Sequence, residues 1–269
     1  MNKISSLWMG GGIIHLLIFW LFTACDFTPR IHKDILNAQQ SLSQQNFVEA
    51  SKRYQKILEK SPDEKIKVKI HYQLGEIQSL HLGKYWQAIK HFQKVQESTQ
   101  EPLWQVKSEE RIAQISFEFL KNYRLSLKSY KRLASFTPRL KNYDKYEYRI
   151  AKSYMGLKKF EMARRAFVEI QKNKNQDHYV DSFYQLGLVH FELKNWQEAI
   201  NKWKLYIQRE KKPDSVVQAK FLMANAFETM EELKKAYNLY YSILGEYPNT
   251  QVVQNRLNAI YKRRVARKR

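Results

Sequence analysis

From Ile31 onwards, one pattern of apolar and polar positions recurs six times along the chain. Each unit has two successive stripes of apolar residues with helical spacing. The first stripe contains a small residue, and the second contains another small residue followed four positions later by a large one. The second small residues lie 36 to 38 positions apart, at Ala50, Ala88, Ser126, Ala163, Ala199 and Ala236. The pattern predicts six helix-turn-helix units that stack into a solenoid, because one such pair cannot bury its apolar faces alone.

The clearest unit spans residues 180–213 and contains Leu186-Gly187, Trp196, Ala199 and Trp203, with Pro213 at its end. This order resembles the tetratricopeptide repeat, in which helix A carries W-x-x-L-G-x-x-Y and helix B carries A-x-x-x-F before a proline. The resemblance implies an all-α, right-handed superhelix, an α-solenoid whose A helices line a concave groove. The usual period of the family is about 34 residues, so the units here are slightly longer than usual.

The resemblance implies close packing of helices A and B at small residues. The packing residues expected are Gly75, Ala88, Ala151, Ala163, Gly187, Ala199, Ala224 and Ala236. The predicted repeats span residues 31–64, 68–102, 106–140, 144–177, 180–213 and 217–248. Five of the six prolines are expected where a helix B ends, because proline cannot continue a helix; they are Pro62, Pro102, Pro138, Pro213 and Pro248.

Residues 249–269 follow the last repeat and predict a capping helix with a basic tail. Val253, Leu257 and Ile260 are spaced for one apolar stripe, which would cover the exposed face of repeat six. Six of the eight residues at 262–269 are basic. Two interpretations of this tail stay open: a frayed, solvated end, or a segment that binds anionic lipid headgroups.

Residues 1–24 resemble a bacterial lipoprotein signal peptide. Lys3 precedes an apolar run from Leu7 to Phe22, and Phe22-Thr23-Ala24-Cys25 resembles a lipobox. The resemblance implies that Cys25 carries diacylglycerol and fatty acyl chains such as palmitate, and that residues 25–30 form a short tether. Phe22 departs from the Leu, Val or Ile usual at its position, so an uncleaved membrane anchor is the alternative. Asp26 resembles the inner-membrane retention signal of enteric lipoproteins.

Composition adds a strong positive charge to this picture. The 269 residues contain 47 Lys and Arg against 26 Asp and Glu, which gives a formal net charge of +21. Two interpretations of this charge stay open: an ordinary lysine-rich helical surface, or a surface that attracts anionic lipid or acidic protein segments. Nucleic acid is not an expected partner, because an exported protein would not meet it in the cytoplasm.

The groove predicted for this fold has two sets of candidate binding residues. Aromatic residues recur at the fifth position of helix A, at Tyr72, Tyr148, Tyr184 and Phe221. They fit plain packing or a groove that grips apolar side chains of a partner. Lys145, Arg149 and Lys152 lie on one helical face and predict a basic patch for acidic or partly extended segments. The asparagines of the family's carboxylate clamp are missing; Ile35, Gln39, Tyr72 and Glu76 stand there.

No arrangement of residues in the sequence predicts catalysis, a cofactor or a small-molecule substrate. There is no nucleophile elbow and no glycine-rich phosphate loop. The spacing of ten between His71, His81 and His91 fits neither an i, i+4 pair nor a zinc finger, so no metal site is expected.

The sequence therefore predicts a binding protein: a lipid-anchored periplasmic scaffold of the bacterial envelope. Its layout resembles the BamD-like lipoproteins of outer-membrane assembly, and also repeat lipoproteins that help assemble pili or secretion channels. If the signal is not cleaved, the alternative is a membrane-anchored adaptor that faces the cytoplasm.

Overall fold

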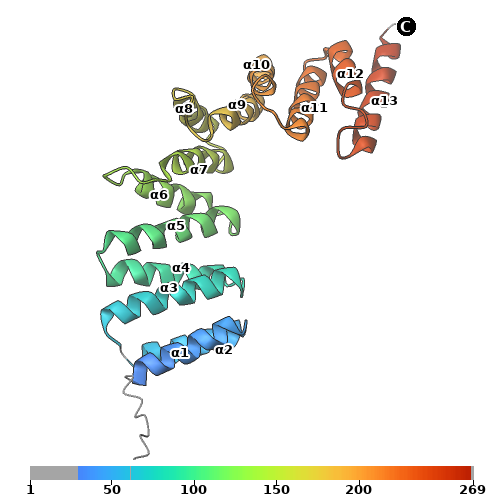
Figure 1. Cartoon of the computed structure of the whole chain (residues 1–269). Helices are drawn as coiled ribbons and strands as arrows, with labels where there is room; N and C mark the ends of the chain where they lie inside the picture. The colour runs from blue at the N-terminus through green and yellow to red at the C-terminus, as the bar shows by residue number, and fades with distance from the viewer. Residues whose placement is uncertain (1–29, 61, 268–269) are drawn as a thin grey trace, which may run out of the picture.

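The computed structural model describes residues 30–60 and 62–267, and these residues form thirteen α-helices. The helices run antiparallel in successive pairs, and each helix packs on its neighbours in sequence (Figure 1). They are α1 (Arg30–Ser43), α2 (Phe47–Glu59), α3 (Glu64–Leu80), α4 (Tyr85–Ser98), α5 (Pro102–Glu118), α6 (Tyr123–Ala134), α7 (Tyr143–Gly156), α8 (Phe160–Ile170), α9 (Tyr179–Glu192), α10 (Trp196–Ile207), α11 (Pro213–Thr229), α12 (Leu233–Tyr241) and α13 (Thr250–Ala266). The predicted all-α solenoid of six helix pairs and a final helix is confirmed.

Every pair turns from helix A to helix B through the same backbone geometry. One residue in each turn has a positive φ, between 51° and 63°, and it always lies five positions before the small residue of helix B. These residues are Gln45, Gly83, Lys121, Lys158, Lys194 and Glu231. The turn is therefore fixed, and the variation in repeat length lies in other parts of each unit.

The centre of each pair is a contact between a small residue on helix A and an aromatic ring on helix B. The small residues are Ala38, Gly75, Ala113, Ala151, Gly187 and Ala224, and all are buried. The rings belong to Tyr54, Phe92, Tyr130, Phe167, Trp203 and Tyr240, each at most 3% exposed. At Gly187 the Trp203 ring comes so close that its Nε1 donates a hydrogen bond to the Tyr184 carbonyl at 3.1 Å. An added Cβ at Gly187 would lie 2.2 Å from that same Nε1.

The outer faces of the first and last helices are mainly polar. In α3, the side chains that pack on the preceding pair are Ile70, Leu74 and Ile77, and all three are buried. The same three positions of α1 hold Lys33, Asn37 and Gln40. At the other end, α13 buries only Val253, Leu257 and Ile260, and most residues on its remaining faces are polar, apart from the exposed Tyr261 and Val265. The core of the described residues thus ends at mainly polar faces of α1 and α13, as expected for a capped solenoid.

Two of the prolines begin helices, so the prediction that five prolines end helices B is wrong for them. Pro102 and Pro213 are the first residues of α5 and α11. Proline is favoured there because the first helical N–H has no partner within the helix and the ring sets the helical φ. With these starts α5 and α11 are 17 residues long, as is α3, against 14 for α7 and α9. This added length contributes to the long repeat period.

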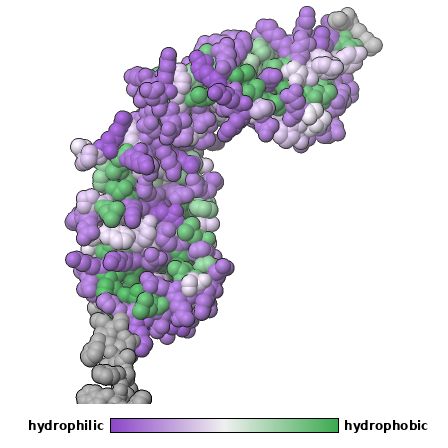
Figure 2. Space-filling view, in the orientation of Figure 1, coloured by the Kyte–Doolittle hydropathy of each residue, from purple (hydrophilic) through white to green (hydrophobic). Residues whose placement is uncertain are grey.

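The solenoid has two arms that meet at an angle near α7 and α8 (Figure 1). Helices α1 to α6 form the arm next to the N-terminus, and α9 to α13 form the other. At the junction of α6 and α7, the buried hydroxyls of Ser126 and Ser153 hydrogen-bond to each other at 3.0 Å. Figure 2 shows that the visible surface of both arms is mostly hydrophilic, with small apolar patches.

We predict that Gly187→Ala lowers the free energy of unfolding by about 1–3 kcal/mol, because the new methyl group overlaps the Trp203 ring. Chemical denaturation followed by circular dichroism measures this loss. In the double variant Gly187→Ala/Trp203→Leu, the total loss should be smaller than the sum of the two single losses. Additive losses would show that the ring contact is not the cause.

Candidate functional site: the concave groove

The A helices of neighbouring repeats lie side by side and line the groove. Direct hydrogen bonds join them: Arg111 on α5 donates from Nε to Glu76 on α3 at 2.6 Å, and Arg149 on α7 donates to Glu118 on α5 at 2.8 Å. Lys152 on α7 donates to Gln185 on α9 at 3.3 Å. The groove surface is therefore held by bonds between residues about one repeat apart.

The predicted aromatic residues are half-buried on this surface, and each packs on a ring of its own helix B. Ring centroids are 5.4 Å apart for Tyr72 and Phe92, 5.9 Å for Tyr148 and Phe167, 5.2 Å for Tyr184 and Tyr206, and 5.5 Å for Phe221 and Tyr240. Three of them also contact a second ring, which lies after that helix B, either in the connecting segment or in the first turn of the next helix. The contacts are Tyr72 with Trp104 at 5.4 Å, Tyr148 with His178 at 4.1 Å, and Phe221 with Tyr247 at 4.4 Å.

These contacts give the aromatic row a structural role. Burial raises the pKa of Tyr72 and of Tyr148 to about 12, so both hydroxyls stay protonated at neutral pH. The rings of Tyr72 and Tyr148 each join their own repeat to the next one, and Phe221 contacts Tyr247 in the segment that leads to α13.

In repeat three, Glu110 occupies the helix A position that these aromatic residues occupy in other repeats. Glu110 was not among the groove residues predicted from the sequence. Glu110 accepts a hydrogen bond from Asn142 Nδ2 at 3.1 Å and another from the Tyr146 hydroxyl. Burial, followed by the bond to Glu110, raises the pKa of Tyr146. The repeat spacing could have identified it, because Glu110 lies midway between Tyr72 and Tyr148 in the sequence. A polar link thus replaces the aromatic one between repeats three and four.

A chain of alternating charges runs along the middle of the groove. It begins with the Glu76–Arg111 pair, continues from Arg111 to Gln114 at 2.8 Å and from Gln114 to Glu118 at 3.0 Å, and ends with Glu118–Arg149. The Arg149 guanidinium also lies 4.5 Å from the centroid of the Phe117 ring. The side chains of both arginines are at most about a quarter exposed. The two acids and two arginines neutralise each other within this chain.

This charge chain changes the interpretation of the basic patch predicted at Lys145, Arg149 and Lys152. Arg149 is already paired with Glu118. Burial, and next the charge of Arg149, lowers the pKa of Lys152, whose ammonium group donates to Gln185. Lys145 is exposed. The three residues share a helix face but do not form a free cluster of three cations.

The N-terminal arm contains a cavity of about 390 Å³ in the groove. Its apolar lining comes from Ile35, Tyr54, Ile66, Ile70 and Trp104, which belong to repeats one to three. Polar side chains also line it, and these are His32, Gln39, Lys69 and Gln73. The combination suits an apolar side chain of a bound segment, with donors and acceptors available for its backbone.

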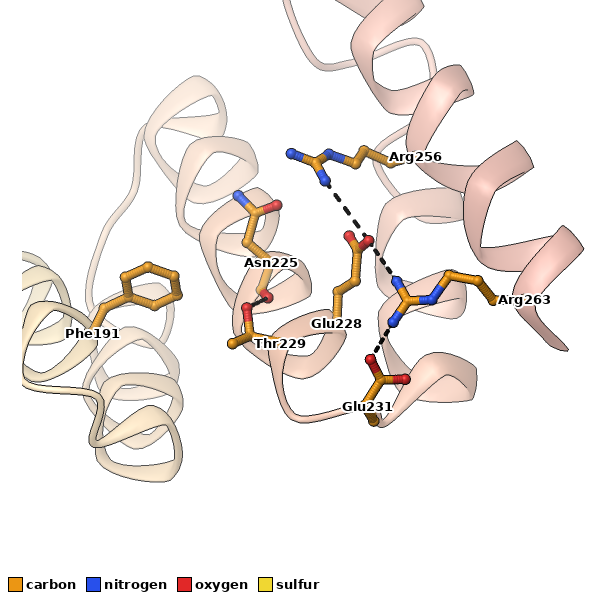
Figure 3. A pocket seen from close by; sticks show the side chains of 7 residues that line it. All are labelled: Phe191, Asn225, Glu228, Thr229, Glu231, Arg256 and Arg263. Carbon is orange, nitrogen blue, oxygen red and sulfur yellow. Dashed lines mark hydrogen bonds and ion pairs between the residues drawn. The ribbon is translucent and has the colours of Figure 1, made fainter. Parts of the chain in front are cut away.

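A second cavity, of about 440 Å³, lies between α9, α11 and α13 (Figure 3). Glu228 stands between Arg263 at 3.0 Å and Arg256 at 3.7 Å, and Arg263 also pairs with Glu231. Arg267 reaches Glu231 at 2.5 Å. Part of the predicted basic tail is therefore helical and paired with acids of repeat six, up to Ala266 where α13 ends. Residues 268–269 lie outside the described part.

The three histidines at a spacing of ten contact rings or each other. Nδ1 of His71 lies 2.9 Å from Nδ1 of His91, and His81 stacks on Phe47 with centroids 3.7 Å apart. Within residues 30–60 and 62–267, no group of three or more His, Cys, Asp or Glu side chains is placed to hold a metal ion.

Two other predictions fall outside the described residues: the signal peptide at residues 1–24, and lipidation at Cys25. Among the described helices, none is both long and apolar enough to cross a membrane.

Comparison with known proteins agrees with this geometry. Residues 181–212 match the tetratricopeptide repeat family. No curated protein sequence matches the chain. The match covers one helix pair, α9 and α10, and the fold of the described residues is that of a tetratricopeptide-repeat superhelix.

Solved structures with the same fold include three that cover most of this chain. The sensor-bearing signal transduction ATPase PH0952 from Pyrococcus horikoshii aligns with a TM-score of 0.59 at 16% identity, over 86% of this chain and 38% of that one. PilW, a widely conserved type IV pilus biogenesis factor, aligns with 0.53 at 12% identity, over 84% and 97%. PilF from Pseudomonas aeruginosa aligns with 0.50 at 15% identity, over 84% and 95%. At these sequence identities, the similarity shows a shared fold and nothing about function.

We predict that acid destabilises the protein partly through His71 and His91. Their Nδ1–Nδ1 hydrogen bond needs one neutral acceptor, and burial lowers the pKa of both, that of His91 to about 4. The unfolded chain, with histidine pKa near 6.5, binds more protons as the pH falls below that value. The contribution to stability is thus complete above pH 6.5 and is lost towards pH 4.

Denaturation at pH 7 and pH 4.5 tests this. The loss of stability between the two should be about 1–2 kcal/mol smaller in His71→Gln/His91→Gln than in the wild type. The exposed His32→Gln is the matched control and should behave as the wild type does. An unchanged loss in the double variant would contradict the prediction.

Proposed function

We propose that this protein is a lipid-anchored scaffold on the periplasmic side of a bacterial envelope. It holds partner proteins in its groove during assembly of envelope, outer-membrane or secretion complexes. The observation that carries the proposal is the cavity of the N-terminal arm, which opens in the groove of a fold that presents such surfaces to proteins.

The cavity favours an extended segment with an apolar side chain. Trp104 and the isoleucines provide an apolar wall, and Gln39 and Gln73 are exposed on adjacent A helices. An amide side chain both donates and accepts, so two of them suit the backbone of an extended chain. Lys69, also at this cavity, is exposed and favours an acidic residue beside the apolar one.

The anchor is proposed from the sequence before α1. Cys25 lies five residues ahead of Arg30, where α1 begins, so an acylated Cys25 would keep repeat one close to the membrane. The shared fold of PilW, a pilus biogenesis factor, is compatible with an envelope role. Phe22 favours the second candidate, an adaptor with an uncleaved N-terminal helix that faces the cytoplasm.

We predict that blocking the cavity abolishes partner binding without unfolding the protein. Gln39→Arg/Gln73→Arg places two long charged side chains at exposed positions of the cavity. Affinity capture after crosslinking in cells should recover partners at least tenfold less well with this variant, a loss equivalent to about 1.4 kcal/mol or more.

The matched control is Gln55→Arg/Gln93→Arg, which makes the same change at exposed positions of α2 and α4, on the opposite side of the same repeats. It should retain the wild-type partners. Equal recovery with both variants would exclude the cavity as the binding site.

We predict that a clickable fatty acid labels the wild type in cells and does not label Cys25→Ala. Protease treatment of spheroplasts should also degrade the wild type, which would place the repeats outside the inner membrane. Equal labelling of both proteins would contradict lipidation at Cys25. Protection from the protease would favour the cytoplasmic adaptor.

A further inference from the structure

The outward faces of the B helices differ between the two arms. Each of α2, α4 and α6 exposes three residues four positions apart, on the side away from helix A. In these three helices the exposed residues are Val48, Lys52 and Lys56; Trp86, Lys90 and Lys94; and Arg124, Lys128 and Arg132. Seven of the nine are cations, and we call this surface the basic convex face.

The same positions of the last three B helices are close to neutral. They hold Glu161, Arg165 and Glu169; Gln197, Asn201 and Leu205; and Lys234, Asn238 and Ser242. The concentration of charge is therefore a property of the N-terminal arm and not of the repeat as such.

Most cations of this face form no ion pair among the described residues. Lys94 pairs with Glu97 at 2.7 Å and Arg132 with Glu109 at 2.6 Å. The central residue of each row, Lys52, Lys90 or Lys128, forms no ion pair among the described residues. The face keeps a large excess of positive charge that a partner must neutralise.

Two large apolar side chains lie one helical turn from these lysines. Val48 is 69% exposed and Trp86 is 52% exposed. Phe119, 48% exposed, stacks on Tyr85 beside Trp86 with centroids 4.6 Å apart. Exposed tryptophan beside lysine is typical of protein surfaces whose side chains enter the headgroup layer of a bilayer.

We propose that the basic convex face rests on an anionic phospholipid bilayer, with Trp86 and Val48 entering the headgroup layer. Three adjacent antiparallel helix pairs present their cations on one side, which suits an extended planar surface. The groove lies on the A helices, opposite this face, and so stays open to partner proteins. The inference is independent of lipidation at Cys25.

Vesicle co-sedimentation tests the proposal with the chain from Arg30 to Arg269, which contains all thirteen described helices and carries neither the apolar run nor Cys25. Far-UV circular dichroism verifies that it is folded. We expect it to bind mixed vesicles of phosphatidylcholine and phosphatidylglycerol at least tenfold more tightly than vesicles of phosphatidylcholine alone. Each basic residue near such a surface contributes about fivefold, so Lys52→Gln/Lys90→Gln/Lys128→Gln should weaken binding about 100-fold.

The matched control is Lys174→Gln/Lys204→Gln/Lys234→Gln, which removes the same charge at exposed positions of the second half of the chain. It should change binding by less than about threefold, since those residues would lie beyond the Debye length from the surface. Trp86→Ser should weaken binding severalfold, and this loss should persist in added salt.

Three results would overturn the proposal. The wild type could show no preference for anionic vesicles. The two triple variants could lose binding equally, which would indicate a response to net charge alone. A DNA duplex or polyglutamate could bind more tightly than the vesicles, with the same dependence on Lys52, Lys90 and Lys128, which would assign the face to nucleic acid or to an acidic protein.

Discussion

The contact between a small residue on helix A and an aromatic ring on helix B determines how close the two helices of each pair can come. Where the ring is largest, at Trp203, only Gly187 leaves room for it. Because the contact recurs in all six pairs, together with one left-handed residue in each turn, all pairs share one geometry. That common geometry brings the A helices together as one groove surface.

The groove follows from this packing, and its chemistry varies along it. Aromatic contacts of Tyr72 and Tyr148 join repeats two and three and repeats four and five, whereas Glu110 with Asn142 and Tyr146 joins repeats three and four. In the middle of the groove, Glu76, Arg111, Glu118 and Arg149 are paired with each other. Open, partly apolar space lies instead in the N-terminal arm, around Trp104. The proposed partner site therefore lies in that arm.

The sequence was sufficient to predict the repeats, because their spacing reflects contacts within one helix pair. The small residues at Gly75, Gly187 and the helix B alanines are buried as that spacing requires. Contacts between repeats were harder to predict. The ion pair of Arg149 with Glu118 joins two different repeats, and nothing in the pattern selects this acid among its neighbours. The prolines were misassigned because the residue is compatible with both a helix end and the next helix start.

We propose that partner proteins bind the groove of the N-terminal arm while the opposite face is turned to the membrane. A photoreactive amino acid placed in cells at Gln73, at the groove, and at Gln93, on the other side of the same repeat, distinguishes these two faces. We expect protein adducts from position 73 and few or none from position 93. Protein adducts mainly from position 93 would contradict it.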